Sequence, residues 1–185
     1  MGPIRWLAVV VLCVLAVWVA HITDSIWDAL RAPGSVVVLR HSYVPGTSDP
    51  SNTRLDDCST QRNLDESGRA QARRIGEAFR KNGITVGAVL SSPRCRCLDT
   101  ARLAFGQAQS WDVLQGSLND KERRREVAEI GRVIAEHRSG PPLVLVTHGN
   151  VVADLTGPTV RMGAFVVLRR TPDGRHTVAG QLYVD

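Results

Sequence analysis

The chain has 185 residues, 43% of them hydrophobic and 22% charged, a length and composition that predict one globular domain with a substantial core. It carries 23 Lys and Arg against 18 Asp and Glu, a formal net charge of +5, which suits an anionic ligand or an anionic surface. Aromatic residues make up only 5% and no basic run is interleaved with them, so we do not expect nucleic acid as a partner.

Residues 1–23 predict an export segment that precedes the fold. A positively charged start, MGPIR, is followed by an apolar run from Trp6 to Ala20, the layout of a secretory signal or a membrane anchor. Cleavage after Ala20 would place the bulky Trp18 where a small residue is needed, so we favour an uncleaved anchor over a cleaved signal. A buried core helix is the alternative. Export places the rest of the chain outside the cytoplasm, either secreted or membrane-anchored and facing the periplasm or the cell exterior.

The segment after the anchor, residues 24–34, predicts a short tether, and residues 35–185 predict the folded domain. An uninterrupted apolar run at 36–39 predicts a strand that is buried on both faces and ends at Arg40. The polar segment 42–63 is rich in Pro, Gly, Ser, Thr and Asp. Loops of this length in a compact domain are usually functional or disordered.

Helices and strands alternate along the rest of the chain. Asp65 predicts the N-cap of a helix that ends at Gly83. A second helix opens at Pro93, and 106–120 is irregular. The remaining predicted elements are a charged amphipathic helix over 122–137, strands over 84–91 and 143–147, and a C-terminal hairpin of 164–170 with 177–183. This alternation predicts an α/β fold with three layers, α/β/α, and a largely parallel central sheet.

Three cysteines lie outside the export segment, and an oxidising compartment would let two of them pair. Cys58 has two possible partners, Cys95 and Cys97, because a bridge between Cys95 and Cys97 would close too small a ring. Small buried thiols are the alternative. No second close Cys or His pair accompanies the cysteines, so we do not predict a metal site.

Polar side chains follow three of the predicted strands, and ligands of open α/β sheets bind outside the carboxyl ends of strands. These segments are Arg40-His41, Ser91-Ser92-Pro93-Arg94-Cys95-Arg96 and Thr147-His148-Gly149. Arginine binds phosphate in a bidentate geometry, and a neutral histidine can attack phosphorus to form a phosphoenzyme. The three segments therefore predict a site for a doubly charged anion, and its chemistry needs no metal.

At these segments the chain resembles the histidine phosphatase superfamily, which includes the cofactor-dependent phosphoglycerate mutases. The resemblance spans roughly residues 35–185 and implies a phosphoglycerate mutase-like fold, with His41 as the phosphate-accepting nucleophile. Arg40 and Arg96 correspond to the phosphate clamp, and His148 to the second pocket histidine. Arg96 takes the clamp role in place of Arg94, because it stands three residues after Pro93.

A looser resemblance concerns the segment Cys58-Ser59-Thr60-Gln61-Arg62-Asn63-Leu64 together with the helix start Gly68-Arg69-Ala70-Gln71-Ala72. Both resemble an envelope-associated subgroup that includes relatives of lipopolysaccharide-core heptose phosphatases. This resemblance favours an extracytoplasmic substrate.

Two positions depart from the superfamily pattern. Ser42 stands where glycine is usual, and its hydroxyl can donate a hydrogen bond to a phosphate oxygen. The backbone at Gly149, which follows the usual pattern, is a further predicted phosphate contact. The usual glutamate that protonates the leaving oxygen is absent. Asp120 is the carboxylate that we favour as general acid; the others available are Asp112, Glu122 and Asp154. A leaving group of low pKa would make the acid dispensable.

These observations predict a phosphomonoesterase, a phosphoric monoester hydrolase without cofactor or metal, that works through a phosphohistidine. The expected substrate is a phosphorylated small molecule or envelope glycan, and the expected contact with the membrane is made by the N-terminal segment. Two alternatives remain: phosphotransfer of the mutase type, which uses the same nucleophile, and a non-catalytic phosphate-binding module.

Overall fold

The computed structural model describes residues 26–185. The predicted export segment, residues 1–23, lies outside the described residues. In the part of the chain that the structure describes, no helix is both long enough and apolar enough to cross a membrane.

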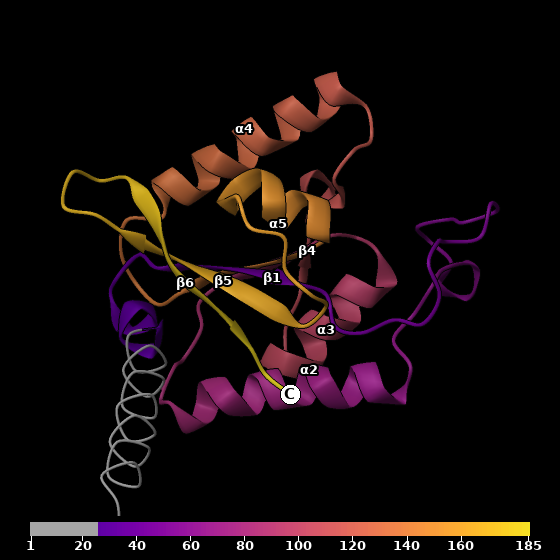
Figure 1. Cartoon of the computed structure of the whole chain (residues 1–185), viewed down its shortest axis with the longest axis horizontal. Helices are drawn as coiled ribbons and strands as arrows, with labels where there is room; N and C mark the ends of the chain where they lie inside the picture. The colour runs from indigo at the N-terminus through magenta and orange to yellow at the C-terminus, as the bar shows by residue number, and fades with distance from the viewer. Residues whose placement is uncertain (1–25) are drawn as a thin grey trace, which may run out of the picture.

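A six-stranded sheet forms the centre of the molecule, in the order β3-β2-β4-β1-β5-β6 (Figure 1). The strands are β1 (Val36–Arg40), β2 (Val89–Ser91), β3 (Gln109–Ser110), β4 (Leu143–Thr147), β5 (Ala164–Arg170) and β6 (His176–Tyr183). The first four strands of this order are parallel, whereas β5 runs antiparallel to both of its neighbours. The predicted α/β fold with a largely parallel sheet and a C-terminal hairpin is confirmed.

Alternating side chains of β1 face two separate cores. Val37 and Leu39 belong to the core under α2 (Glu66–Lys81) and α3 (Cys95–Phe105). Val36 and Val38 belong to the core under α4 (Asp120–Glu136) and α5 (Gly149–Thr156). Figure 1 shows these two helix pairs on opposite faces of the sheet. A strand covered on both faces needs apolar side chains at every position, which explains the uninterrupted run in β1.

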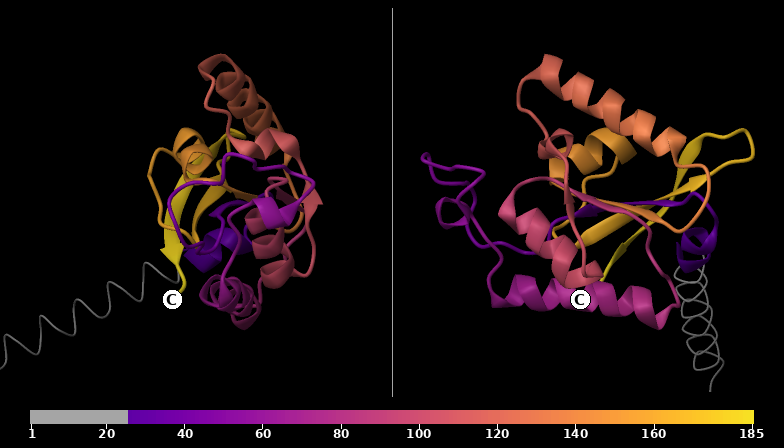
Figure 2. Two further views of the ribbon diagram at one scale, coloured as in Figure 1. Left: turned by 90° about the vertical axis from the view of Figure 1, so that its right-hand side faces the viewer. Right: turned by 180° about the vertical axis from the view of Figure 1, so that it is seen from behind.

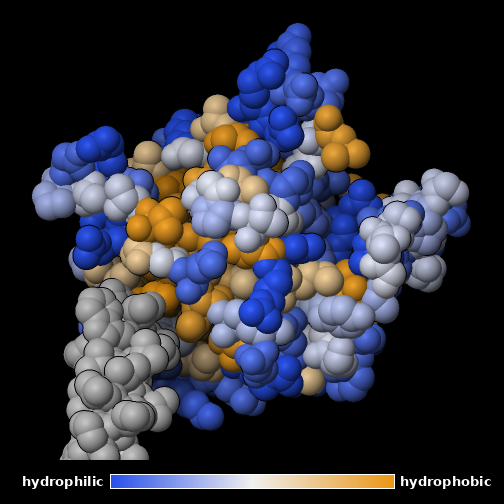
Figure 3. Space-filling view, viewed as in Figure 1, coloured by the Kyte–Doolittle hydropathy of each residue, from blue (hydrophilic) through white to orange (hydrophobic). Residues whose placement is uncertain are grey.

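The exposed face of α4 is hydrophilic in the space-filling view of Figure 3, and only Ile130 and Ile134 of this helix are fully buried. The amphipathic helix predicted over 122–137 is therefore present and begins slightly earlier, because Asn119 caps it with hydrogen bonds to the N–H groups of Lys121 and Glu122.

The predicted tether, residues 24–34, contains a short helix. Residues 26–31 are helical, and the side chains of Ile26 and Leu30 are buried in the same core as α2. The ring of Trp27 packs edge-on against Phe79, with centroids 5.4 Å apart. The folded domain thus starts before residue 35, because this short helix covers apolar surface that the sheet and α2 leave open.

The strand predicted over 84–91 is wrong for residues 84–88. The strand β2 begins at Val89, and its partner β4 begins at Leu143, directly after Pro141-Pro142. Backbone hydrogen bonds continue only to Gly87, whose N–H donates to the carbonyl of Pro142 at 2.9 Å, because Pro142 has no N–H to donate in return. The segment 106–120, predicted as irregular, contains the two-residue strand β3 and a 3-10 helix, η2 (Asp112–Gln115).

Gly76 lets α2 and α3 approach closely, and its replacement is expected to be costly. A Cβ atom at Gly76 would lie 2.0 Å from the backbone oxygen of Ala104, whereas a Cβ at Gly131 in α4 would meet nothing within 4 Å. We expect Gly76→Ala to lower the free energy of unfolding by about 2–3 kcal/mol through helix displacement. Gly131→Ala, the matched helical control, raises it by about 0.5–1 kcal/mol. Chemical denaturation of both variants tests the pair, and equal stabilities would contradict this account of the α2–α3 contact.

Candidate active site

The ends of three parallel strands bring the predicted site residues together. Arg40 pairs in register with Thr147, and the N–H of His41 donates to the carbonyl of Thr147 at 2.9 Å. The N–H of Ser92 donates to the carbonyl of Val146, also at 2.9 Å. Because these strands are parallel neighbours, the residues that follow each of them lie at one edge of the sheet.

The rings of His41 and His148 meet edge-on in this cluster, with centroids 5.4 Å apart and only 5% and 9% of the two residues' surfaces exposed. The Nδ1 atom of His41 lies 2.8 Å from the carbonyl oxygen of Ser42. A carbonyl only accepts, so Nδ1 carries the hydrogen and Nε2 keeps its lone pair. His41 is therefore held in the tautomer that presents a nucleophilic nitrogen.

Burial keeps both rings neutral. It lowers the pKa of His41 to about 3, helped by the positive charges of Arg96, Arg40 and Arg62 and opposed by the Ser42 carbonyl. The pKa of His148 is likewise well below its usual range, first through burial and then through His41 and the arginines. At neutral pH the lone pair on Nε2 of His41 is thus available.

Arg40 and Arg96 reach the cluster from different elements. Nη1 of Arg40 donates to the carbonyl of Val160 at 2.7 Å, and its guanidinium lies against Gly149, where a Cβ would stand 3.2 Å from Cζ. Gly149 thus makes room for Arg40 beside the start of α5. Arg96, in the first turn of α3, is buried, and its Nη1 contacts both carboxylate oxygens of Asp49 at 3.0 and 3.1 Å.

Several polar atoms of the cluster are buried without a hydrogen-bond partner. They are Nε of Arg40, Oγ of Ser42, Nη1 of Arg94 and Nε of Arg96. Buried polar groups in folded proteins are nearly always paired, so a group of unpaired donors around two neutral histidines needs an explanation. A tetrahedral oxyanion beside His41 would supply the missing acceptors.

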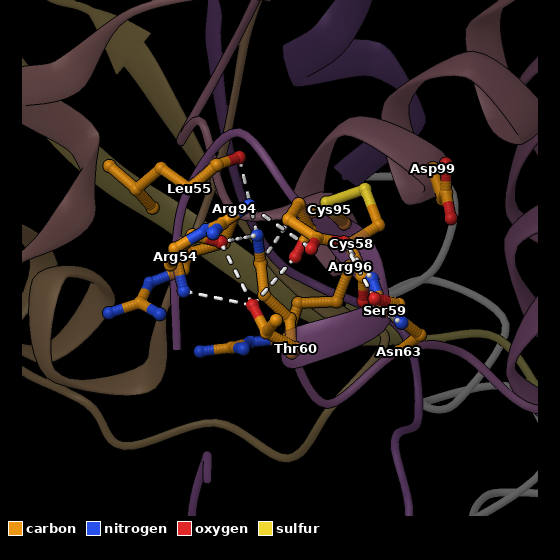
Figure 4. Close-up of a disulfide and its surroundings, with 12 residues drawn as sticks. Arg54, Leu55, Cys58, Ser59, Thr60, Asn63, Arg94, Cys95, Arg96 and Asp99 are labelled. Carbon is orange, nitrogen blue, oxygen red and sulfur yellow. Dashed lines mark hydrogen bonds and ion pairs between the residues drawn. A yellow bond between two sulfur atoms is a disulfide. The ribbon is translucent and has the colours of Figure 1, made fainter. Parts of the chain in front are cut away.

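A disulfide joins Cys58 to Cys95 and attaches the loop 42–63 to the start of α3 (Figure 4). This loop projects beyond the helical layers (Figure 2) and contains the short 3-10 helix η1 (Cys58–Thr60). The side-chain oxygen of Gln61 accepts from the N–H of Cys95 at 3.0 Å, which adds a second attachment. Of the two pairings left open by the sequence, the structure has Cys58 with Cys95.

Cys97, the remaining described cysteine, is a free and buried thiol. Its Sγ lies 3.7 Å from Nε2 of His148, and burial raises its pKa to about 12. Nε2 of His148 also lies 2.9 Å from Oγ of Ser92. Cys97 therefore stays protonated and packs beneath the second histidine.

Asp120 does not join these contacts. It lies in the first turn of α4, where its side chain is 72% exposed and pairs with Arg123 at 3.0 Å. Nothing in the structure thus assigns it the acid role. Among residues 26–185, no group of three or more His, Cys, Asp or Glu side chains could hold a metal ion.

Three residues near the cluster were not predicted as site residues: Asp49, Arg62 and Arg94. Arg62 and Arg94 stand in two segments singled out in the sequence, 58–64 and 91–96, so their positive charge could have indicated a place beside an anionic ligand. Asp49 had none, because an aspartate in a polar loop is ordinarily solvated and only the folded path of the loop brings it to Arg96.

Comparisons with known proteins concern the sequence and the fold. A family model described as "Histidine phosphatase superfamily (branch 1)" matches residues 36–116. No curated protein matches the chain.

Solved structures share the fold at low sequence identity. The protein histidine phosphatase SixA, complexed with tungstate, has a TM-score of 0.60 at 16% identity, covering 80% of this chain and 96% of that one. YhfR from Bacillus stearothermophilus has a TM-score of 0.64 at 16% identity, covering 82% of this chain and 98% of YhfR. Phosphoglycerate mutase from Thermus thermophilus has a TM-score of 0.57 at 20% identity, covering 82% of this chain and 99% of the mutase.

The residues matched by the family model include the first two strand-end motifs, and the third motif joins them in space through β4. Residues 36–116 thus match the model of the histidine phosphatase superfamily, branch 1, and the described domain shares its fold with a solved phosphatase and a solved mutase.

Proposed function

We propose that the protein is a phosphomonoesterase that hydrolyses a phosphate ester through a phosphohistidine at His41, without a metal. The observation that carries the proposal is the buried, neutral His41 ring. Its Nδ1–H donates to the carbonyl of Ser42, and the arginines of the cluster have donors without a hydrogen-bond partner. This arrangement supports the proposal, because it would hold a phosphate dianion next to a nitrogen lone pair.

In the first step Nε2 of His41 attacks phosphorus. The P–N bond forms while the bond to the leaving oxygen breaks, and the electron pair departs with that oxygen. Arg40 and Arg96 stabilise the negative charge on the three equatorial oxygens. The leaving oxygen takes its proton from water, or departs as the anion when its pKa is low.

In the second step a water molecule attacks the phosphohistidine. A P–O bond forms, the P–N bond breaks, and its electrons return to Nε2, so that inorganic phosphate leaves and His41 is regenerated. The Nδ1–H bond to the Ser42 carbonyl persists through both steps and stabilises the positive charge that the ring carries as phosphohistidine.

The proposed substrate is extracytoplasmic: a phosphorylated small molecule or envelope glycan, met by a domain anchored through residues 1–23. The disulfide between Cys58 and Cys95 supports this location, because disulfides persist in oxidising compartments. The net charge of +5 is compatible with an anionic envelope surface.

Hydrolysis of p-nitrophenyl phosphate by the full chain in detergent, with and without a chelator, tests the proposal. We expect chelator-resistant turnover and, after rapid quenching in alkali, a transient phosphoenzyme that acid destroys, as the phosphorus–nitrogen bond requires. A stable phosphoenzyme that transfers its phosphate to a second alcohol would indicate a mutase instead. A folded protein that binds phosphate but forms no phosphoenzyme would indicate a binding module.

A further inference from the structure

We propose that Asp49 is a positioning residue, which orients Arg96, and with it Arg94, toward the phosphate. The proposal rests on the proposed function. Asp49 lies in the loop 42–63, and both of its carboxylate oxygens contact Nη1 of Arg96. Its Oδ2 is also 3.6 Å from Nη1 of Arg94. One carboxylate thus stands between two guanidinium groups that start only two residues apart.

The contact engages Nη1 of Arg96 and leaves its Nε free. That Nε is buried and has no hydrogen-bond partner. A guanidinium presents donors along more than one edge, so a carboxylate on Nη1 can hold the group while another edge remains for phosphate. This geometry favours orientation of Arg96 over occupation of the phosphate position by Asp49.

Asp49 is itself held in place by its own loop. The backbone N–H of Arg62 donates to Oδ1 of Asp49 at 3.0 Å. The side chain of Arg62 in turn donates to the carbonyl oxygens of Pro45 and Gly46, at 3.0 and 2.6 Å. With the Cys58–Cys95 disulfide, these bonds fix the carboxylate relative to α3 (Figure 4 shows the disulfide beside Arg94 and Arg96).

The charges explain why an anchor is needed. Arg94 and Arg96 carry like charges that repel each other, and Arg40 and Arg62 add to the positive field at His41. Without Asp49, the long Arg96 side chain would have other rotamers to populate, away from the phosphate. An anchored side chain gives up this freedom before the substrate arrives.

The protonation state of Asp49 fits orientation and not proton donation. Partial burial alone would raise its pKa, but the Arg62 N–H and the charges of Arg96 and Arg94 lower it below the usual range. Asp49 is therefore a carboxylate at neutral pH, and it does not replace the missing general acid.

The test compares Asp49→Asn, Asp49→Glu and the control Asp56→Asn, all in the full chain. Asp56 lies in the same loop, is 81% exposed and pairs only loosely with Arg54, at 3.4 Å. We expect Asp49→Asn to lower kcat/KM for p-nitrophenyl phosphate about tenfold, while Asp49→Glu recovers part of this loss because it keeps the charge. Asp56→Asn keeps the wild-type value.

Thermal unfolding and the affinity for inorganic phosphate are measured beside kcat/KM. An unchanged kcat/KM in Asp49→Asn would overturn the proposal, and so would a raised kcat/KM with tighter phosphate binding, which would identify Asp49 as an internal competitor. Equal losses in Asp49→Asn and Asp49→Glu with a matching fall in Tm would overturn it in favour of a structural role. A wild-type chain without phosphate binding or turnover would instead refute the proposed function itself.

Discussion

Replacing His41 by alanine is expected to lower the turnover of p-nitrophenyl phosphate by about 10⁴-fold or more, as removal of a covalent nucleophile does in other hydrolases. The physical reason is that no other group near the phosphate offers a neutral lone pair in the required place. The neighbouring His148 has its Nε2 engaged near Ser92 and Cys97. Inorganic phosphate should still bind, because Arg40 and Arg96 remain.

Rapid-quench trapping of the phosphoenzyme, steady-state hydrolysis and calorimetric titration with phosphate measure the three parts of this result. His137→Ala is the matched control, because His137 lies beyond the end of α4, away from the cluster. We expect this control to retain turnover, phosphoenzyme and phosphate binding. An active His41→Ala variant would remove His41 as the nucleophile, whatever the affinity for phosphate.

The second large effect concerns stability in acid. Burial lowers the pKa of His41 in the folded state from 6.5 to about 3. Between these values the unfolded chain binds the proton and the folded chain does not, so the free energy of unfolding rises with pH across this window. The part of the free energy of unfolding that depends on a neutral His41 is fully present above pH 6.5 and is lost as the pH falls toward 3. His148 contributes with the same sign, since its pKa is also lowered.

Each pKa unit corresponds to about 1.4 kcal/mol, so lowering the pH from about 7 to about 5 should remove about 2 kcal/mol through His41 alone. Urea denaturation at both pH values measures this loss, and we expect the wild type to lose about 2 kcal/mol more than His41→Ala. Parallel losses in wild type and His41→Ala would mean that His41 is not held neutral by burial.

The strand-end site shows how much of a function can be predicted from a sequence alone. The apolar run of β1, the hairpin of β5 and β6, and the three polar segments after strands are local patterns with local physical causes. Parallel strands bring their carboxyl ends to one edge whatever the rest of the chain does. His41, Arg40, Arg96 and His148 could therefore be grouped before any coordinates, and the structure places them together.

Other features depend on contacts between distant residues, and these only the tertiary structure decided. The helix at 26–31 is stabilised because Ile26 and Leu30 cover apolar surface of the core. The strand β2 does not extend back to residue 84, because two prolines stand where β4 would need backbone donors. The sequence left two possible partners for Cys58, namely Cys95 and Cys97. These two cysteines are two residues apart in one helix, so their side chains point in different directions from it. The path of the loop selected Cys95.

Asp49 is the clearest case of a residue whose role depends on the tertiary structure. Its residue type and its neighbours in the sequence are those of an ordinary solvated loop, and no periodicity marks it. Its carboxylate meets Arg96 only because the disulfide and the bonds of Arg62 bring a loop residue 47 positions away onto the first turn of α3. The sequence by itself thus determined the strands and the groups at their ends, since those follow from local pattern. The tertiary structure decided which charges meet, because that depends on how a long polar loop closes over the site.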